Sequence, residues 1–341
     1  MSSDPPDPAG RLAPAIRLAP AKVNLTLAVL GRRTDGYHDL HSVMVPVDLA
    51  DRLSVSPLPP GASDTLHVAG FDAGPVPDNL VLRAIAAARR AARPAWGRPE
   101  PPPALAARLD KRIPVAAGLA GGSSDAAAAI DAALDAWNVE LDGDGRRRLA
   151  LEIGSDVPFF LAAGPALVEG RGERVTPLAW LRDQGAGRDR PGLLLVTPAI
   201  AIATPAVFAA WDAGARVAGG AARLASAHLA EELRTGLRVP DLLVRASVLA
   251  AANDLAPAAS AVEPALVPFR RALLRLLARP VGLSGSGPTH WALYPSYAEA
   301  AAAAERVRTA IAAGDLPGPG TQTPSVAAVR IIAHDDTRRE P

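Results

Sequence analysis

The stretch PVAAGLAGGSSDAAAAI at residues 114–130 has the composition of a phosphate-binding loop. Its glycines permit positive φ and let a ligand approach the main chain closely. The alanine-rich helix that should follow has unpaired N–H groups and partial positive charge at its start, which suits an anion. Ser123, Ser124 or Asp125 could cap this helix, and the serine hydroxyls could also reach phosphate or a metal ion. We interpret the stretch as an anion-binding loop for a nucleoside triphosphate; a tight packing turn is the alternative.

Two familiar phosphate-binding patterns are missing from this loop. No lysine follows the glycines as in G-x-x-x-x-G-K-[ST], and no G-x-G-x-x-G precedes a ribose-binding acid in a βαβ unit. A phosphate site at this loop would therefore belong to another fold.

Three further segments contain residues that could complete a kinase site. They are PAKVNL at 20–25, GSDVP at 154–158 and GLSGSG at 282–287. A kinase of small alcohols needs a phosphate cradle, a cation near the transferred phosphoryl group, a group that positions the hydroxyl, and an acceptor pocket. Lys22, Asp156 and the aromatic residues near Tyr37 could supply the last three.

Hydrophobic periodicity and turn residues predict an α+β arrangement without strict βαβ alternation. The expected strands cover residues 15–30, 41–49, 51–57, 104–114, 193–197 and 326–333, with a hairpin connection at 31–40 and a strand–turn–strand at 281–294. The expected helices cover residues 79–92 (capped by Asp78), 123–137, 144–153, 204–212, 222–234, 241–250, 264–278 and 297–313. Residues 154–161 should form a turn and a short apolar strand, and residues 181–192 a loop.

Composition narrows the class of protein. The 341 residues can form two domains or one large one, and a net charge of +1 argues against a dedicated nucleic-acid surface. The chain has no cysteine and its first residues do not resemble a secretory signal, so a cytoplasmic location is expected. Residues 192–211 are uncharged and long enough to cross a bilayer, but Pro198 and Pro205 should divide them into a strand, a loop and a helix.

Lysine is scarce in this chain. Lys22 and Lys111 are the only lysines, and the other cationic side chains are arginines. Lysine is therefore expected where a compact ammonium on a slim stem is needed. His41 and His290 lack metal-binding spacing with other ligands and are expected to be structural.

These segments together resemble the GHMP kinase superfamily, and within it the 4-diphosphocytidyl-2-C-methyl-D-erythritol kinase family. The matching stretches, in the family's order, are APAKVNLTLAVLGRRTDGYHDLHSV (19–43), PDNLVLRA (77–84), KRIPVAAGLAGGSSDAAAA (111–129), GSDVPFFL (154–161), EGRGE (169–173), TPAVF (204–208), ND (253–254) and LSGSG (283–287). The segment GRRTDGYH distinguishes this family from other GHMP kinases, which share only the phosphate loop.

The resemblance implies a two-domain GHMP kinase fold, in which mixed or antiparallel sheets pack with helices and the active site lies in the cleft between the domains. The N-terminal domain would cover residues 13–167 and the C-terminal domain residues 168–334, whose final strand could return to the first domain. The tails at 1–12 and 335–341 look disordered.

The activity implied is ATP-dependent phosphorylation of the 2-hydroxyl of a methylerythritol moiety linked to cytidine diphosphate, in non-mevalonate isoprenoid synthesis. The partners would be ATP, Mg²⁺ and this small molecule, with no nucleic acid and no membrane, and the protein would be a monomer or a homodimer. The alternatives are another GHMP kinase, of the homoserine or mevalonate type, or a non-catalytic nucleotide-binding protein on the same fold.

The resemblance also assigns the loop residues by matched position. Those that would bind the ATP phosphates are Pro114, Val115, Ala116, Ala117, Gly118, Leu119, Ala120, Gly121, Gly122, Ser123 and Ser124. Ser124 is also a candidate Mg²⁺ ligand. Because some relatives have glycine at Ala116, Ala117 and Ala120, we expect ordinary φ at these alanines and positive φ at the remaining glycines, Gly118, Gly121 and Gly122.

Two residues are assigned to catalysis in the same way. Asp156 would act as the base or position the hydroxyl. Lys22 would lie beside it, hold the hydroxyl and Asp156 in register, and offset developing negative charge. The turn at 283–287 would close the site from the second domain.

The acceptor site is assigned four residues. Asn24 would line it, and His38 would hydrogen-bond the cytosine edge. Tyr37 and Phe208 would stack on the faces of the base, although Phe208 could instead be a simple core residue of its helix.

Overall fold

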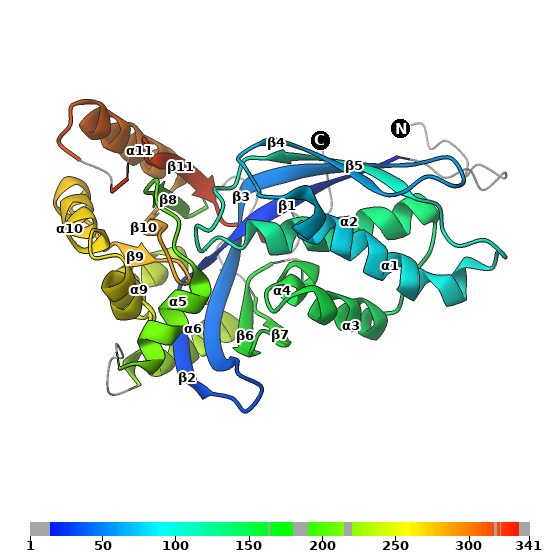
Figure 1. Ribbon diagram of the computed structural model, residues 1–341. Coiled ribbons are helices and arrows are strands. Elements are labelled where there is room, and N and C mark those ends of the chain that lie inside the picture. Colours follow the sequence, from blue (N-terminus) through cyan, green and yellow to red (C-terminus); the bar gives the residue numbers. More distant parts are fainter. Residues whose placement is uncertain are drawn as a thin grey trace, which may run out of the picture. The chain divides into compact units, whose positions relative to one another are not determined.

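The computed structural model of the chain describes residues 14–162, 164–179, 190–214, 220–316, 319–320 and 322–333. The chain, whose elements are labelled in Figure 1, divides into two compact units. Unit 1 comprises Met1–Ala19, Ala50–Arg112 and Gly122–Pro158, and unit 2 comprises Pro20–Leu49, Ile113–Gly121 and Phe159–Pro341. The two units interleave along the chain, and the expected domain boundary between residues 167 and 168 stays a prediction.

Unit 1 packs helices against a small sheet. Its elements are the first half of β1 (Ala15–Asn24), β4 (Thr65–Gly70), β5 (Leu105–Lys111), the C-terminal part of β3 (His38–Pro57), the 3₁₀ turn Val76–Asp78, α1 (Leu80–Trp96), nearly all of α2 (Gly121–Trp137) and α3 (Gly143–Ile153). β5 pairs antiparallel with β3 and parallel with β4. The apolar residues of α1 recur every three or four positions, as on an amphipathic helix, whereas α2 is buried on most faces.

Unit 2 holds the remaining elements. Its strands are the end of β1 (Ala15–Asn24), β2 (Ala28–Arg32), the start of β3, β6 (Ala166–Gly170), β7 (Arg174–Pro177), β8 (Gly192–Thr197), β9 (Gly282–Leu283), β10 (His290–Tyr294) and β11 (Ser325–Arg330). Its helices are α4 (Val157–Leu161, which starts in unit 1), α5 (Thr204–Asp212), α6 (Ala221–Thr235), α7 (Val239–Val244), α8 (Ala246–Ala251), α9 (Ala256–Val262), α10 (Leu266–Leu277) and α11 (Tyr297–Ala312).

Two groups of strands organise unit 2. β3 pairs with β1, β2 and β6, and β7 pairs with β6. The second group is a four-stranded antiparallel sheet in the order β11-β8-β10-β9, with α11 packed against β11 and β8. The mixed pairing, together with the covering helices, confirms the expected α+β class.

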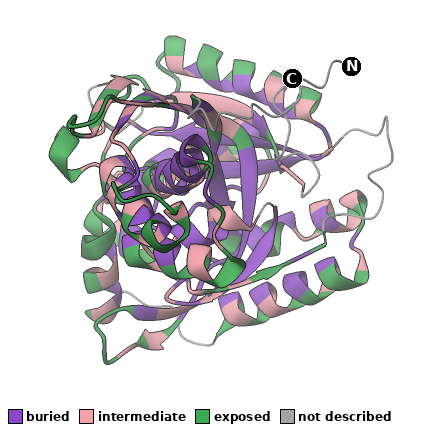
Figure 2. Ribbon diagram, turned by 90° about the vertical axis from the view of Figure 1, so that its right-hand side faces the viewer, coloured by how far each residue is buried: buried purple, intermediate pink, exposed green. Residues whose placement is uncertain are grey.

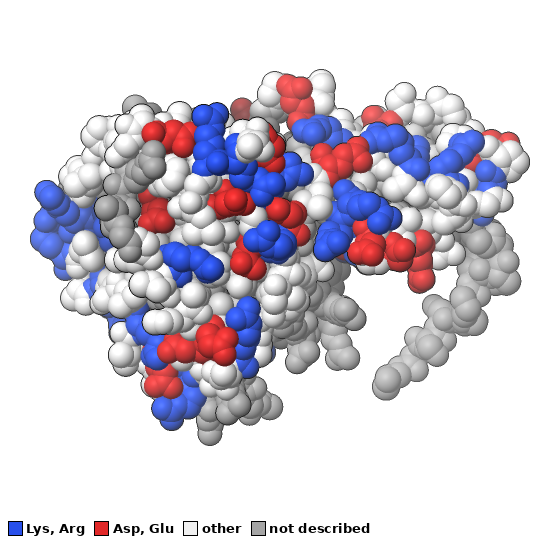
Figure 3. Space-filling view, turned by 90° about the horizontal axis from the view of Figure 1, so that it is seen from below, with Lys and Arg blue, Asp and Glu red and all other residues white. Residues whose placement is uncertain are grey.

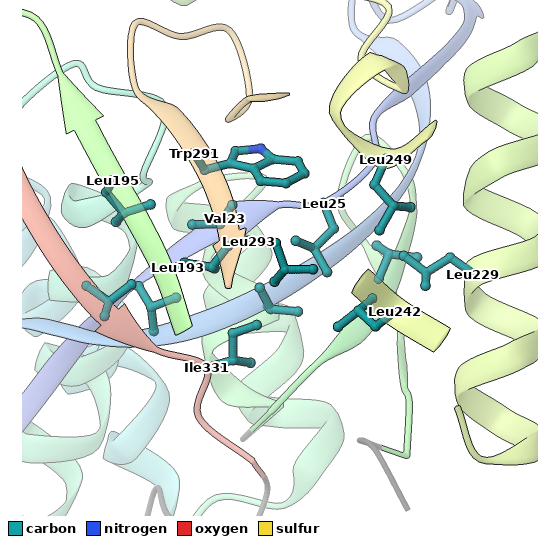
Figure 4. Close-up of a cluster of buried hydrophobic side chains, with 14 of the residues drawn as sticks. Val23, Leu25, Leu193, Leu195, Leu229, Leu242, Leu249, Trp291, Leu293 and Ile331 are labelled. Carbon is teal, nitrogen blue, oxygen red and sulfur yellow. The ribbon is translucent and has the colours of Figure 1, made fainter. Parts of the chain in front are cut away.

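A core cluster of unit 2 fixes the orientation of β1. Figure 4 shows apolar side chains converging from β1 and the residue after it, β8, β10, α6, α7 and α8: Val23, Leu25, Leu193, Leu195, Leu229, Leu242, Leu249, Trp291 and Leu293, together with Ile331. Successive side chains of a strand point to opposite faces. Because Val23 enters this core, its neighbours Lys22 and Asn24 lie on the other face of β1.

Burial follows the amphipathic pattern in both units. In Figure 2 exposed and buried positions alternate along the outer helices. Strands β8 and β10 are buried throughout, whereas β4 and β7 have no buried residue. Figure 3 shows acidic and basic side chains intermingled over much of one face. Ion pairs of the described residues include Arg33–Asp39 at 2.8 Å. The expected absence of a nucleic-acid partner stays a prediction.

Most expected elements are confirmed within a few residues. The helices expected at 144–153, 204–212, 222–234, 264–278 and 297–313 are α3, α5, α6, α10 and α11, and the strands expected at 104–114, 193–197 and 326–333 are β5, β8 and β11. The uncharged stretch 192–211 forms β8, a loop and part of α5, as its prolines predict. No helix among the described residues has the length and apolar character needed to cross a membrane. The expected tails and residues 181–189 lie outside the described residues.

One strand replaces the two expected at 41–49 and 51–57. β3 runs unbroken from His38 to Pro57, because Asp51 does not form a turn. This residue is buried, and its carboxylate accepts hydrogen bonds from Lys111 Nζ and the Arg112 backbone N–H. The expectation of two strands was wrong because Lys111 and the Arg112 backbone take the place of water around the Asp51 carboxylate, so this residue can lie inside a strand.

Other errors concern local helix chemistry. The short strand expected within 154–161 is helix α4, whose second residue, Pro158, has a φ suited to a first helical turn. The single helix expected at 241–250 is two helices divided at Arg245. Asn79, not Asp78, caps α1, because its side chain accepts from Val81 N at 3.0 Å. Helix α9 was missed.

Candidate active site

The phosphate-loop candidate has a backbone of alternating φ sign. Ala116, Gly118 and Ala120 have φ of 53°, 74° and 53°, respectively, whereas Gly121 and Gly122 lie in α2 without positive φ. The expectation of ordinary φ was therefore wrong at Ala116 and Ala120, and the expectation of positive φ was wrong at Gly121 and Gly122. Ordinary φ at Ala117 and positive φ at Gly118 are confirmed. The error arose because α2 begins earlier than expected and takes up both glycines.

Three consecutive carbonyls of this loop accept hydrogen bonds from other residues of unit 2, to which the loop itself belongs. Thr289 N donates to Ala117 O at 3.3 Å, and Lys22 N donates to Leu119 O at 3.1 Å. The carbonyl of Gly118 accepts from Lys22 Nζ at 2.8 Å and from Ser284 Oγ at 2.9 Å.

The amides of the loop differ from its carbonyls in their hydrogen bonding. Within the described part of the chain, the N–H groups of residues 116–120 have no hydrogen-bond acceptor. Alternation of φ sign turns successive N–H groups toward a common concavity, which binds anions. The loop thus has bound carbonyls and available amides, as an anion cradle requires.

Lys22 is the cation attached to this loop. It is 4% exposed, and its Nζ donates to Asn24 Oδ1 at 2.6 Å as well as to Gly118 O. Asn24 in turn donates from Nδ2 to Ser42 Oγ at 2.8 Å, and its backbone N–H donates to Ser284 Oγ at 3.2 Å. The structure therefore brings two predicted site residues, Lys22 and Asn24, into contact with each other and with the loop.

The turn at residues 283–287 packs directly on the loop. A Cβ at Gly118 would lie 2.2 Å from Ser284 O, and a Cβ at Gly285 would lie 3.2 Å from Lys22 Nζ. Asn253 holds the turn by donating from Nδ2 to the carbonyls of Leu283 and Gly285, both at 2.9 Å. Both glycines also have positive φ, so a larger residue at either position would disturb the contact.

Of the aromatic residues of the predicted acceptor site, Phe208 contacts His38 and Tyr37 contacts Arg171. Phe208 stacks on the imidazole with centroids 4.5 Å apart, and His38 Nε2 lies 2.9 Å from Asp212 Oδ1. Tyr37 is 52% exposed, and the guanidinium of Arg171 lies 5.2 Å from its ring centroid. The same turn reaches this region, because Ser286 Oγ lies 2.9 Å from Thr204 Oγ1 at the start of α5.

Asp156 is a half-buried residue of the turn between α3 and α4. It belongs to unit 1, whereas Lys22 belongs to unit 2. The convergence of these two side chains on one hydroxyl stays a prediction.

The start of α2 differs from the expectation. The helix begins at Gly121, so Ser123, Ser124 and Asp125 lie within its first turns and do not cap it. The hydroxyl of Ser124 is buried and has no hydrogen-bond partner within the described residues. Among those residues no group of three or more His, Asp or Glu side chains is placed to hold a metal ion.

The second lysine is buried beneath this helix. Lys111 Nζ donates to Asp125 Oδ2 at 2.7 Å and to the carboxylate of Asp51. Burial raises the pKa of Asp125 to about 7 despite the opposing effect of the Lys111 ammonium. Two carboxylates around one ammonium leave an excess negative charge, which a proton on Asp125 neutralises. Both lysines are thus buried, and Lys22 is the one that contacts the loop.

Three contributors to this arrangement were not predicted as site residues: Ser42, Asn253 and Ser284. All three are buried polar side chains. Asn253 and Ser284 lie in matching stretches, ND and LSGSG, which was the available signal. Ser42 also lies in a matching stretch, residues 19–43, but nothing in its residue type distinguishes it from an ordinary buried serine of a strand.

Comparison with known proteins places the chain among kinases. The family description "GHMP kinases N terminal domain" matches residues 79–164, and "GHMP kinases C terminal" matches residues 230–313. The 4-diphosphocytidyl-2-C-methyl-D-erythritol kinase of Anaeromyxobacter dehalogenans is 37% identical over 328 residues, which cover 96% of this chain and 92% of that protein.

Comparison with solved structures also finds kinases. A crystal structure of 4-(cytidine 5'-diphospho)-2C-methyl-D-erythritol kinase is 33% identical, with a TM-score of 0.63, and the match covers 93% of this chain and 99% of the other. A homoserine kinase from Cytophaga hutchinsonii has a TM-score of 0.67 at 16% identity, covering 98% of each chain. The second similarity shows a shared fold alone.

Proposed function

Because the chain belongs to the 4-diphosphocytidyl-2-C-methyl-D-erythritol kinase family of GHMP kinases, we propose that it transfers the γ-phosphoryl group of ATP to the 2-hydroxyl of that cytidyl substrate. The products are the 2-phosphate and ADP. The observation that carries the proposal is the bond from the Lys22 ammonium to the carbonyl of Gly118, which fixes a cation to the centre of the phosphate cradle.

The loop residues 114–124 bind the ATP phosphates in this proposal. The available N–H groups of residues 116–120 and the N-terminus of α2 offer hydrogen bonds and partial positive charge to phosphate oxygens. The bonds from Lys22, Ser284 and Thr289 to the loop carbonyls keep those amides in place, so little reorganisation is needed when ATP binds.

Lys22 and Asp156 carry the transfer. The substrate 2-oxygen forms a bond to the γ-phosphorus as the bond to the β–γ bridging oxygen breaks, and ADP leaves. The hydroxyl proton passes to the Asp156 carboxylate, and the Lys22 ammonium offsets negative charge on the transferred group. In a loose phosphoryl transfer, positioning contributes more than basicity, which suits a tertiary alcohol.

His38, Tyr37 and Phe208 hold the cytosine, and Asn24 lines the methylerythritol end. Asp212 accepts from His38 Nε2 and so keeps the proton there, which leaves Nδ1 as an acceptor for an amino group such as that of cytosine. Tyr37 presents an exposed ring for stacking, whereas one face of Phe208 is already covered by the imidazole. Stacking on Tyr37 should therefore contribute more than stacking on Phe208.

Mg²⁺ accompanies ATP in this proposal and neutralises phosphate charge during transfer. The buried Ser124 hydroxyl, which lacks a partner within the described residues, is an oxygen donor of the type that Mg²⁺ prefers. It would supply one ligand, and phosphate oxygens and water would supply the others. A cytoplasmic location and a monomeric or homodimeric state remain proposals.

The test uses the purified protein, ATP, Mg²⁺ and the cytidyl substrate. We expect stoichiometric ADP and a new phosphomonoester signal by ³¹P NMR. Homoserine and mevalonate are the matched alternative acceptors. Turnover of either one without turnover of the cytidyl substrate would favour another GHMP kinase, and ATP binding without any turnover would favour a non-catalytic protein.

A further inference from the structure

A continuous chain of buried hydrogen bonds runs from Lys22 into the interior of unit 2. Lys22 Nζ donates to Asn24 Oδ1 at 2.6 Å, Asn24 Nδ2 donates to Ser42 Oγ at 2.8 Å, and Ser42 Oγ donates to Thr26 O at 2.5 Å. All four residues are at most 4% exposed. Water therefore has little access to replace a missing member.

The strands explain why these side chains meet. Lys22, Asn24 and Thr26 alternate along β1 and the residues that follow it, so they share the face opposite the apolar core. β3 pairs with β1, and Leu25 N donates to Val43 O at 3.0 Å. This pairing places Ser42 beside Asn24.

The donors and acceptors permit only one orientation of the Asn24 amide. The Thr26 carbonyl can only accept, so the single hydroxyl proton of Ser42 points to it. The Ser42 oxygen must then accept, which requires the NH₂ group of Asn24 on that side. The Lys22 ammonium can only donate, which requires the amide oxygen of Asn24 on the other side.

We infer that Ser42 is a positioning residue for phosphoryl transfer: its hydroxyl holds the amide of Asn24 with the oxygen toward Lys22, and thereby holds the ammonium against Gly118 O. The catalytic consequence rests on the proposed function, whereas the effect on the ammonium does not. Without the hydroxyl, the Asn24 NH₂ loses its buried acceptor, and of the two bonds that orient the amide the one to Lys22 Nζ remains. Lys22 then loses a fixed partner.

The chain offers a matched control in Ser226. Its hydroxyl is equally buried and lies 2.9 Å from Thr26 Oγ1 and 2.8 Å from His41 Nδ1, in the same polar interior. Ser226→Ala therefore removes the same atoms as Ser42→Ala and leaves a similar unpaired partner, but it does not contact Asn24. Ser42→Thr retains the hydroxyl and serves as the conservative variant.

The first measurement needs no substrate. Because Lys22 and Lys111 are the only lysines, ¹³Cε-lysine labelling gives two side-chain signals, which Lys22→Arg assigns. We expect Ser42→Ala to move the Lys22 signal and leave the Lys111 signal in place, and Ser226→Ala to move neither. An unmoved Lys22 signal in a folded Ser42→Ala protein would overturn the inference, whatever the activity of the protein.

The second measurement is kinetic. We expect Ser42→Ala to lower kcat by about 10- to 100-fold with little change in KM for ATP, and Ser42→Thr and Ser226→Ala to stay within about 2-fold of the parent. The Ser42→Ala, Asn24→Ala double variant should be no slower than Asn24→Ala, because Ser42 acts through Asn24. Equal losses in Ser42→Ala and Ser226→Ala, or additive losses in the double variant, would show a merely structural role. If the parent turns over no cytidyl substrate, the proposed function fails while the NMR result still decides the role of Ser42.

Discussion

At the scale of single residues, Lys22 and Asp156 are the groups on which turnover depends. Lys22→Ala removes the ammonium bonded to Gly118 O, and Asp156→Ala removes the proposed proton acceptor. Each should lower kcat by at least about 100-fold, because each acts on charge or position in the transition state. ATP affinity should change little, because Ser284 and Thr289 still hold the carbonyls of the loop in both variants, and isothermal titration would measure it.

The control for the aspartate is Asp144→Ala, which removes an exposed carboxylate from α3. Its turnover should match that of the parent. Near-parental turnover in the two site variants would refute their assigned roles, provided that thermal unfolding shows both to be folded.

Recognition of the base can also be tested by substituting a single residue, Tyr37. Its half-exposed ring contributes little to the packed core, so Tyr37→Ala should leave the free energy of unfolding nearly unchanged. It should raise KM for the cytidyl substrate by about 10-fold or more, since base–aromatic stacking contributes about 1–3 kcal/mol. KM for ATP should stay constant.

Tyr297→Ala is the matched comparison, because that ring also contacts an arginine, Arg330, but lies in α11. Equal loss of ATP and cytidyl affinity in Tyr37→Ala would argue against cytosine stacking.

At the scale of elements, the loop before α2 stores backbone strain. Ala116 and Ala120 have left-handed φ, which costs alanine about 1–2 kcal/mol relative to glycine. Ala116→Gly and Ala120→Gly should each raise the free energy of unfolding by roughly 0.5–1 kcal/mol, after the larger chain entropy of glycine is included. Urea unfolding would measure the change.

Ala117 provides the internal control for this loop, since its φ is not positive. Ala117→Gly should lower stability by roughly 0.5–1 kcal/mol. A shift of the same sign in all three glycine variants would contradict the assignment of strain.

Elements with strong local patterns could be predicted from the sequence, and those that depend on distant partners could not. The amphipathic helix α1 and the buried helix α2 follow from their own residues. Two strands, 41–49 and 51–57, are expected where the structure has the single strand β3, in which Lys111, 60 positions away, stabilises the buried Asp51. The start of α2 was misplaced by two residues, which was enough to invert the expected φ pattern.

At the scale of the whole molecule, sequence motifs predict the candidate residues but not the contacts between them. The bond from Lys22 to Gly118 spans 96 positions and that from Ser284 to Gly118 spans 166. No local pattern encodes such pairings. Ser42 shows the limit most clearly, because its importance lies in which atoms it accepts from and donates to, and these depend on the register of two strands.

The buried cluster of Lys111, Asp51 and Asp125 links three elements of unit 1 and makes its stability depend on pH. Burial raises the pKa of Asp125 to about 7, whereas a carboxyl of the unfolded chain titrates near about 3.9. At a pH between these two pKa values, Asp125 is protonated in the folded state and ionised in the unfolded state. The free energy of unfolding therefore falls as pH rises, by up to about 1.4 kcal/mol per pH unit. This contribution is complete below pH about 4 and is lost as pH rises through about 7.

Asp125→Asn removes the titrating group, so its stability should vary less between pH 5 and pH 8 than that of the parent. The matched control is Asp64→Asn at the other end of β5. Asp64 also binds a cation, Arg89, and a backbone N–H, that of Leu105, yet it lies outside the cluster. Urea unfolding at several pH values should give the control the slope of the parent and Asp125→Asn a flatter one. Parallel curves for the parent and Asp125→Asn would mean that this carboxyl is already ionised at pH 5 and that Lys111 outweighs its burial.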